Sequence, residues 1–355
     1  MKLIKNVRLF GECVDIAVEN GKIADIATVA SGKYKDVLGV DFSGHKIYPG
    51  LIDIHTHGAI GLDTMDARLD ELSQFYLSHG TTTWYPTTMT MSTEDILRAT
   101  SAKYEGRGAN IPGFHLEGPY INTSRKGAQD PKYILDPSIE HFKTLGNIKL
   151  VTLAPECVGA MDFIRECDAV VCIGHTDCDY DTAMEAFQAG AKCLTHTFNA
   201  MPSIHHRNPG PIPAGADAGA YAQLICDGVH VHPSVVRMLV KLYGTDRVAL
   251  ISDSLAATGL ADGNYVSGGL AVTVKGGSAT LADGTIAGST VTLFECVRRA
   301  ISFGISESDA VKMASETPAT LMGLNKGKIE VGYDADFIIV DDEFNLVRAI
   351  ARGEF

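Results

Sequence analysis

The sequence predicts an α/β protein: a TIM-type (β/α)8 barrel with a small β-sandwich domain formed from both chain termini. Eight short apolar or β-branched runs recur through the middle of the chain, and most gaps between them hold helix-like segments. Both ends instead carry strand-like segments separated by turn residues. Eight alternating units of this length indicate a parallel sheet closed into a barrel. The predicted division is 1–47 and 326–355 for the two parts of the sandwich and 48–325 for the barrel.

The composition is typical of a soluble globular protein with a large core. Of 355 residues, 45% are hydrophobic, and the net charge of −13 argues against a nucleic-acid partner or an anionic membrane surface. The N-terminus lacks the apolar core of a signal peptide, and no run of about 18 apolar residues predicts a membrane span. The eight cysteines include no CxxC pair. We therefore expect buried free thiols and a cytoplasmic location.

The two chain ends are expected to fold together. LIKNVRLF and CVDIAVENGKIADIA, near the N-terminus, read as strands, and Asn20-Gly21 within the second predicts a hairpin turn. This segment is too small to form a strong core alone. KGKIEVGYDADFIIVDDEFNLVRAIARG, at the other end, is again strand-like and supplies a partner.

The barrel strands are predicted from apolar runs that end in polar residues. The runs are LIDIHTHG (51–58), TTTWYPTTMT (81–90), IPGFHLEG (111–118), IKLVTLAPE (148–156), AVVCIGHTD (169–177), KCLTHTFNAM (192–201), AQLICDGVHVH (222–232) and RVALISDSLA (247–256). The clearest helices between them are predicted over 66–79, 92–106, 179–190 and 233–244. Each of these segments ends at or beside a glycine, the usual stop signal of a helix.

Two histidines close the first barrel strand. Alternate side chains of a strand share a face, so His55 and His57 point the same way and could bind a metal. An isolated HxH motif is a hydrogen-bonded structural pair about as often as it is a metal site. The residues at the later strand ends argue against a purely structural role, because active sites of such barrels lie at the C-terminal ends of the strands. Candidate ligands and proton carriers there are His115, Glu117, His175, His196, Asp227, His230 and Asp253.

Histidine and carboxylate without a thiolate pattern suit Zn²⁺, Fe²⁺, Mn²⁺ or Co²⁺. Any one strand-end residue could be a cap or a hydrogen-bonded structural group, but the whole set is hard to explain in that way. Such an ion activates water and polarises a carbonyl, while a carboxylate on the last strand can move the proton. The pattern therefore favours metal-assisted hydrolysis.

The chain resembles the N-acetylglucosamine-6-phosphate deacetylase family of the amidohydrolase superfamily along nearly its full length. The segments that carry the resemblance are PGLIDIHTHG, GFHLEGPYIN, KGAQDP, IGHTD, THTFNAMP with the downstream RNPG, DGVHV, ISDSLAATG, AGSTVTL and GYDADFIIVD. HLEGP together with HxxNAM is highly specific within the superfamily. The implied reaction converts N-acetyl-D-glucosamine 6-phosphate and water into D-glucosamine 6-phosphate and acetate.

The resemblance also implies roles for individual residues. Glu117, His175 and His196 would hold the principal divalent metal, and His55 with His57 would hold a second one. One or two ions per subunit are therefore possible. The general base, and then the acid that protonates the departing amine, would be Asp253. Some relatives lack the histidine pair and work with one metal.

The family pattern places the substrate phosphate at the sixth strand end. Asn199 and Ala200 would meet it, and His230 would bind the sugar or its phosphate. Arg207 would reach the phosphate from the neighbouring subunit of a homodimer. The adjacent His205 and His206 add positive charge to this segment, but the simpler interpretation for both is a solvated loop.

One position departs from part of the family. Some members carry a histidine twelve residues after the metal-binding glutamate, where this chain has Gln129. Its amide can donate a hydrogen bond but supplies no positive charge. We expect Gln129 to contact the scissile carbonyl or a metal-bound water, with the second metal contributing more of the polarisation.

Three other functions share part of this sequence pattern. The same deacetylation of the galactosamine isomer is the closest, because the sequence does not distinguish one inverted hydroxyl. A cyclic amidase commonly needs a lysine at the end of strand four, where this chain has only Lys149 at the strand's start. A non-catalytic scaffold would be expected to lose ligands that this chain keeps.

Overall fold

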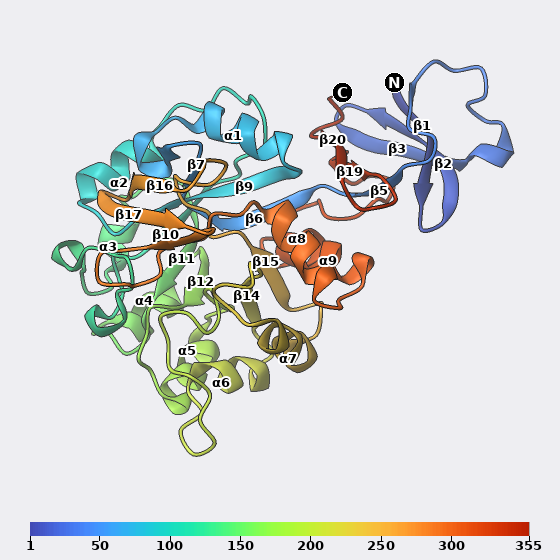
Figure 1. Cartoon of the computed structure of the whole chain (residues 1–355). Coiled ribbons are helices and arrows are strands. Elements are labelled where there is room, and N and C mark those ends of the chain that lie inside the picture. Colours follow the sequence, from blue (N-terminus) through green and yellow to red (C-terminus); the bar gives the residue numbers. More distant parts are fainter. Residues whose placement is uncertain (355) are drawn as a thin grey trace.

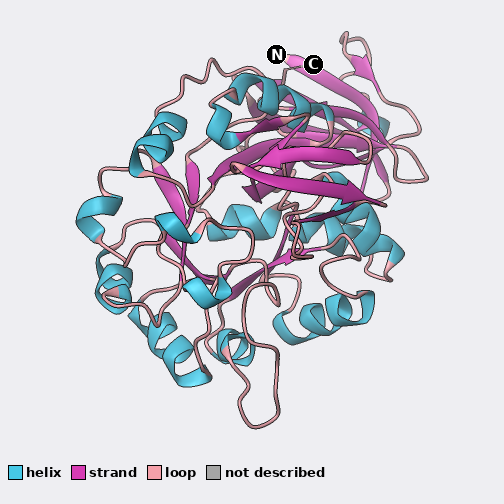
Figure 2. Ribbon diagram, turned by 60° about the vertical axis from the view of Figure 1, so that its left-hand side comes forward, coloured by secondary structure: helices cyan, strands magenta, loops and turns pink. Residues whose placement is uncertain are grey.

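The computed structural model describes residues 1–354 and confirms the predicted fold class. Eight strands form one parallel sheet in the order β15-β14-β13-β12-β11-β10-β9-β6, and helices lie around its outside (Figures 1 and 2). The barrel strands are β6 (Leu51–Thr56), β9 (Thr81–Thr88), β10 (Phe114–Glu117), β11 (Ile148–Leu153), β12 (Val170–Ile173), β13 (Cys193–Leu194), β14 (Tyr221–Ile225) and β15 (Val248–Ile251). All eight coincide with the predicted runs.

The helices of the barrel pack their apolar faces on these strands. The α-helices are α1 (Leu69–Ser78), α2 (Thr93–Thr100), α3 (Ile139–Phe142), α4 (Ala160–Glu166), α5 (Tyr180–Ala189), α6 (Pro211–Asp217), α7 (Pro233–Tyr243), α8 (Leu293–Ser302), α9 (Glu307–Met313) and α10 (Glu316–Leu321). Leu72 and Tyr76 of α1 are buried against Trp84 of β9 in the largest core cluster. No helix of the described residues is long and apolar enough to cross a membrane.

The barrel closes between its first and last strands at the end that carries the candidate ligands. Asp253, just after β15, donates its backbone N–H to the carbonyl of His55 on β6 at 2.9 Å. The carbonyl of Ser254 accepts the N–H of His57 at 2.7 Å. Because these bonds join the two segments directly, the histidine pair and Asp253 are held side by side by the backbone.

The chain termini meet in a separate seven-stranded sheet at one side of the barrel (Figure 1). Its strands are β1 (Lys2–Leu9), β2 (Glu12–Glu19), β3 (Lys22–Thr28), β4 (Val40–Asp41), β5 (Lys46–Pro49), β19 (Phe337–Val340) and β20 (Leu346–Ile350). Asn20 and Gly21 join β2 to β3 with φ angles of 51° and 73°, as a two-residue hairpin requires. Between residues 326 and 354, the strands are β19 and β20 alone. The domain boundaries given above remain predictions.

A small sheet lies between β15 and α8, in a region for which the sequence had suggested no element. It consists of β16 (Gly263–Ser267), β17 (Leu270–Lys275) and β18 (Ser278–Thr280), joined as antiparallel neighbours. Ser267 of β16 donates its hydroxyl to Asp63, the last residue of β8 (Leu62–Asp63), which pairs with β7 (Gly58–Ala59). This sheet therefore packs over the C-terminal end of the barrel, beside the candidate site (Figure 1).

Candidate active site

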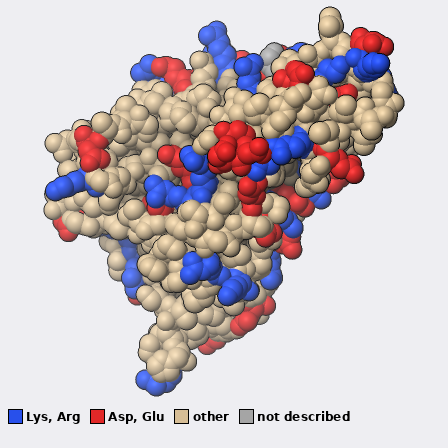
Figure 3. All heavy atoms as spheres, turned by 45° about the vertical axis from the view of Figure 1, so that its right-hand side comes forward, with Lys and Arg blue, Asp and Glu red and all other residues tan. Residues whose placement is uncertain are grey.

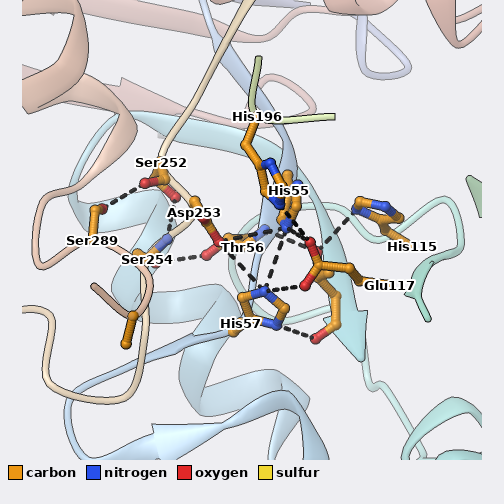
Figure 4. Close-up of polar contacts among 12 residues, drawn as sticks. His55, Thr56, His57, His115, Glu117, His196, Ser252, Asp253, Ser254 and Ser289 are labelled. Carbon is orange, nitrogen blue, oxygen red and sulfur yellow. Dashed lines mark hydrogen bonds and ion pairs between the residues drawn. The ribbon is translucent and has the colours of Figure 1, made fainter. Parts of the chain in front are cut away.

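Glu117, at the end of β10, lies at the centre of four histidines. Its Oε1 is 3.1 Å from the Nε2 atoms of both His55 and His196 and 3.3 Å from that of His175. Its Oε2 is 3.2 Å from Nε2 of His57. Figure 4 shows the Glu117 carboxylate facing His57 on one side and His55 and His196 on the other. One carboxylate therefore joins two sets of imidazoles contributed by different strands.

Hydrogen bonds at the far side of the rings show which nitrogen faces the centre. Nδ1 of His175 lies 2.8 Å from the carbonyl of Arg125, and Nδ1 of His57 lies 3.2 Å from that of Thr87. A carbonyl only accepts, so these nitrogens carry the hydrogen and donate. Nε2 is therefore the ring nitrogen that faces Glu117 in both residues, and it can carry a proton or bind a metal ion there.

The charges of the site favour such a cation. Burial disfavours the charged form of His55 and His57, but Glu117 and Asp253 outweigh it and raise the pKa of both imidazoles. Burial would likewise raise the pKa of Glu117, yet His55 and His175 hold it well below its usual range. The site thus keeps an ionised carboxylate and attracts positive charge, which protons or a divalent metal can supply.

The donor atoms fit a divalent metal. Two groups bring their ligand atoms within 4.8 Å of one another: His55, His57 and Glu117, and Glu117, His175 and His196. Nε2 of His175 and Nε2 of His196 are 3.1 Å apart. Ligand atoms around a tetrahedral Zn²⁺ at about 2.1 Å are separated by roughly 3.4 Å, so this spacing is suitable. Buried imidazoles and carboxylates are the ligands that Zn²⁺, Fe²⁺, Mn²⁺ and Co²⁺ accept.

Three of the predicted metal-binding and catalytic residues adopt left-handed backbone conformations. The φ angles are 48° at His175, 26° at His196 and 47° at Asp253. Residues with a Cβ rarely occupy this region, and such strain is concentrated at functional sites. Each of the three is separated from the end of its barrel strand by one residue, so the turn redirects its side chain into the barrel mouth.

Asp253 faces the same centre from the eighth strand. Its Oδ1 is 3.5 Å from Nε2 of His55 and 3.4 Å from Nε2 of His57. Its carbonyl accepts the backbone N–H of Ser289 at 2.7 Å, which fixes the residue from the side opposite His55 (Figure 4). Burial opposes ionisation, but the two imidazoles outweigh it and lower the pKa of Asp253. The side chain is therefore a carboxylate and can accept a proton.

Gln129 contacts the central carboxylate directly. Its Oε1 accepts the backbone N–H of Thr90 at 2.7 Å, so its amide nitrogen must be the atom that faces Glu117. That nitrogen donates to Glu117 Oε2 at 2.6 Å. The sequence-based interpretation had Gln129 meeting a carbonyl or a metal-bound water. In the structure its donor is directed at a candidate metal ligand.

These residues form the floor of a cavity of about 410 Å³. Asn199, Ala200 and His230 also line it. Among the residues to which the family resemblance gives a role, all except His55 and Arg207 border this space. Aliphatic side chains form another part of its wall, contributed mainly by β17 and the segments around it. They are Leu255, Leu270, Val272, Leu281 and Ile286. His55 is completely buried beneath the cavity floor.

His230 is held by acceptors on both ring nitrogens. Nδ1 is 2.7 Å from Asp227 Oδ2, and Nε2 is 3.0 Å from the carbonyl of Ala287. Burial disfavours the imidazolium, but the hydrogen bond and charge of Asp227 raise the pKa of His230. With two acceptors, the ring carries hydrogens on both nitrogens. It therefore places a positive charge at the cavity wall, and Asp227 is its partner and lies outside both metal groups.

Arg207 does not border the cavity of its own chain. It is exposed in the segment 202–209, between β13 and α6, which extends away from the barrel (Figure 1). This projection ends in basic atoms in Figure 3. His205 and His206 lie in the same exposed segment with their ring centres 4.4 Å apart. None of these three side chains approaches the Glu117 centre within one chain.

Some functional contacts had no clear sequence signal. His115 did have such a signal, as a strand-end candidate, but it lies outside both metal groups. It is deeper in the barrel, where Thr152 is 2.8 Å from its Nε2 and burial lowers its pKa well below the usual value. Arg125 lines the cavity through a loop that no motif singles out. Gln223 on β14 contacts Nδ1 of His55 at 2.9 Å, but a polar residue inside a strand is not evident as a functional residue from sequence.

Known proteins resemble this chain along nearly its whole length. The model of the Amidohydrolase family matches residues 47–354. N-acetylglucosamine-6-phosphate deacetylase of Bacillus subtilis is 36% identical over 381 residues, covering 99% of this chain and 96% of the relative. N-acetylgalactosamine-6-phosphate deacetylase of Escherichia coli O157:H7 is 33% identical, covering 86% of each.

Solved structures show the same fold over the whole chain. A mutant of N-acetyl-D-glucosamine-6-phosphate deacetylase from Mycobacterium smegmatis, in complex with N-acetyl-D-glucosamine-6-phosphate, superposes with a TM-score of 0.91 at 31% identity, covering 99% of this chain and 98% of that one. N-acetylglucosamine-6-phosphate deacetylase from Thermotoga maritima gives a TM-score of 0.90 at 32% identity, with the same coverage.

Proposed function

Because this chain belongs to the amidohydrolase family, we propose that it hydrolyses the acetamide of N-acetyl-D-glucosamine 6-phosphate. The C–N bond breaks, the oxygen of water is added to the acetyl carbon, and the nitrogen leaves protonated as the amine of D-glucosamine 6-phosphate. Acetate is the second product. The observation that carries this proposal is the convergence of four imidazoles on Glu117 at the floor of one cavity, with Asp253 beside His55 and His57.

We assign the principal divalent ion to Glu117, His175 and His196 and a second ion to His55, His57 and Glu117. When bound, such an ion acts as a Lewis acid toward the acetyl carbonyl and lowers the pKa of water. The donor set suits Zn²⁺, Fe²⁺, Mn²⁺ or Co²⁺, and cellular supply decides among them. The shared carboxylate supports binding of both ions together.

Asp253 is assigned the proton transfers. Its lowered pKa keeps it ionised, as a general base must be before it accepts the proton of the attacking water. The protonated carboxyl can then donate to the departing nitrogen. The backbone bonds to His55 and Ser289 hold it in place for both steps. Gln129 keeps Glu117 oriented through its 2.6 Å hydrogen bond.

The anionic end of the substrate is assigned to the side of the cavity lined by Asn199, Ala200 and His230. His230 supplies a positive charge there, and backbone N–H groups near Asn199 and Ala200 suit a phosphate. Arg207 is assigned to the phosphate of a neighbouring subunit in a homodimer. Its exposed position on a projecting segment supports that assignment, because Arg207 does not line the cavity of its own chain.

The same chemistry on N-acetylgalactosamine 6-phosphate is the second candidate. The Escherichia coli O157:H7 relative named for that sugar covers 86% of this chain, so the alternative has specific support. The glucosamine relatives include that of Bacillus subtilis at higher identity and coverage, which favours the first candidate.

We also propose a cytoplasmic location. All eight cysteines, which lie within the described residues, are free thiols, and five of them are buried. Free thiols of this number persist in a reducing compartment.

The substrate is tested by measuring acetate release from three sugars: N-acetylglucosamine 6-phosphate, its galactosamine isomer and unphosphorylated N-acetylglucosamine. We expect turnover of the first to exceed that of the others by at least tenfold. A preference for the galactosamine isomer would keep the mechanism and replace the substrate. Equal turnover of the unphosphorylated sugar would contradict the phosphate assignment.

A further inference from the structure

A single buried amide connects the two metal groups. Gln223, on β14, is fully buried, and its Oε1 lies 2.9 Å from Nδ1 of His55. The same oxygen accepts the backbone N–H of His196 at 3.4 Å. On the other side, the amide nitrogen of Gln223 is 3.8 Å from Sγ of Cys172. One side chain therefore touches a histidine from each group.

The neighbours of Gln223 fix which way its amide points. The backbone N–H of His196 can only donate, so the atom facing it must be the carbonyl oxygen. Cys172 is completely buried, and burial raises the pKa of its thiol well above the usual value, so its sulfur is an uncharged, weak acceptor for the amide nitrogen. Nδ1 of His55 then carries the hydrogen, and Nε2, which faces Glu117, is the nitrogen left to bind an ion.

His55 differs in this respect from the other histidines of the site. Nδ1 of His57 and Nδ1 of His175 donate to backbone carbonyls, which no substitution removes. Nδ1 of His196 has no hydrogen-bond partner among the described residues. Within residues 1–354, His55 is thus the only member of the two groups whose tautomer depends on another side chain.

We propose that Gln223 is a positioning residue that fixes His55 in its Nδ1–H tautomer and thereby sets the affinity of the His55–His57–Glu117 group for a divalent ion. This inference rests on the proposed metal site and deepens it. Partners of this kind typically contribute 10- to 100-fold to metal affinity. The group formed by Glu117, His175 and His196 needs no such partner and should be much less sensitive.

The test compares metal binding by wild-type protein with that of two variants. Gln223→Met keeps the length of the side chain but removes the acceptor, and Gln223→Glu restores an acceptor oxygen. Metal-free proteins are titrated with Co²⁺ in the presence of a competing chelator, and binding is followed by visible absorbance. We expect two ions in the wild type, about 10- to 100-fold weaker binding of one of them in Gln223→Met, and recovery to within about threefold in Gln223→Glu.

Thr83→Val provides a matched control, because this buried threonine lies on the barrel strand β9 and its hydroxyl has no partner among the described residues. Its Co²⁺ affinities should equal those of the wild type. If Gln223→Met binds both ions as tightly as the wild type, the positioning role is wrong while the metal site stands. If the wild type binds no Co²⁺, both proposals fail together.

A second measurement needs no variant. Selective ¹⁵N labelling of histidine in the Zn²⁺-loaded wild type distinguishes the protonated from the metal-bound ring nitrogen. We expect His55 to show a protonated Nδ1 and a metal-bound Nε2. Metal binding through Nδ1 of His55 would overturn the inference even if every Gln223 variant failed to fold.

Discussion

Gln129 donates its amide hydrogen to Oε2 of Glu117 at 2.6 Å, while its own Oε1 accepts the N–H of Thr90 at 2.7 Å. The side chain is thus fixed at both ends, and it orients the carboxylate on which both metal groups depend. The amide is an uncharged donor, so it holds the Glu117 carboxylate without neutralising its negative charge.

Replacing Gln129 by leucine should weaken the centre. The substitution leaves Glu117 Oε2 without its donor and the N–H of Thr90 without its acceptor, so we expect metal affinity to fall about 10- to 100-fold. Chelator competition measures this effect. Gln129→His can still donate a hydrogen bond to Glu117 and should lose less metal affinity. Identical metal affinities for the leucine and histidine variants would show that this hydrogen bond does not support metal binding.

Asp253→Asn should separate metal binding from chemistry. The amide keeps the size of the side chain but does not accept a proton at neutral pH, so we expect kcat to fall at least 100-fold. The metal content, determined by elemental analysis, should match that of the wild type, because Asp253 lies outside both metal groups. A variant that retains more than a few per cent of kcat would exclude Asp253 as the general base.

The KM for the phosphorylated sugar should rise at alkaline pH. Asp227 raises the pKa of His230, so the imidazolium persists below that raised value and is lost as the pH rises through it. Loss of the positive charge weakens phosphate binding but leaves the reacting atoms unchanged. We therefore expect KM to increase with pH while kcat changes little over the same interval.

Asp227→Asn is the informative comparison, because it removes the charge that raises the pKa of His230. The increase in KM should then begin at lower pH than in the wild type. Steady-state kinetics between about pH 6 and 9 cover the range in which an imidazole near its usual pKa of about 6.5 titrates. An unchanged KM profile in Asp227→Asn would contradict the assigned role of His230.

Arg207→Ala should raise KM about 10- to 100-fold with little effect on kcat, since a guanidinium–phosphate pair is a strong charge-assisted contact. His206→Ala is the matched control from the same exposed segment and should resemble the wild type. Mixing Arg207→Ala with Asp253→Asn subunits tests whether the arginine acts on its neighbour. Recovery of low-KM turnover would place Arg207 in the partner's site, and no recovery would argue against that assignment.

Most of the fold could be predicted from the sequence because the barrel strands are nearly continuous apolar runs with polar ends. The β2–β3 hairpin followed from Asn20-Gly21, whose left-handed conformations need those residue types. The β16–β18 sheet was not anticipated. Its strands are short and half exposed, so no long apolar run marks them, and their position over the cavity depends on contacts such as Ser267 to Asp63.

The site was predictable only in part for a related reason. His55, His57, Glu117, His175 and His196 are recognisable because each chemically distinctive side chain closes a strand. Contacts made by Gln223 and Asp227 depend on which side chains the barrel brings together, and neither glutamine nor a strand-end aspartate is distinctive alone. The direction of the Gln129 amide required the position of Thr90, 39 residues away along the chain.

The most direct test of the account is acetate release from N-acetylglucosamine 6-phosphate by protein before and after its metal is removed. Chelator-treated protein should lose at least about 99% of its activity, and Zn²⁺, Fe²⁺, Mn²⁺ or Co²⁺ should restore it in proportion to the ion bound. Full activity of protein shown by elemental analysis to be free of metal would contradict the assignment of the Glu117 centre as a divalent-metal hydrolase site.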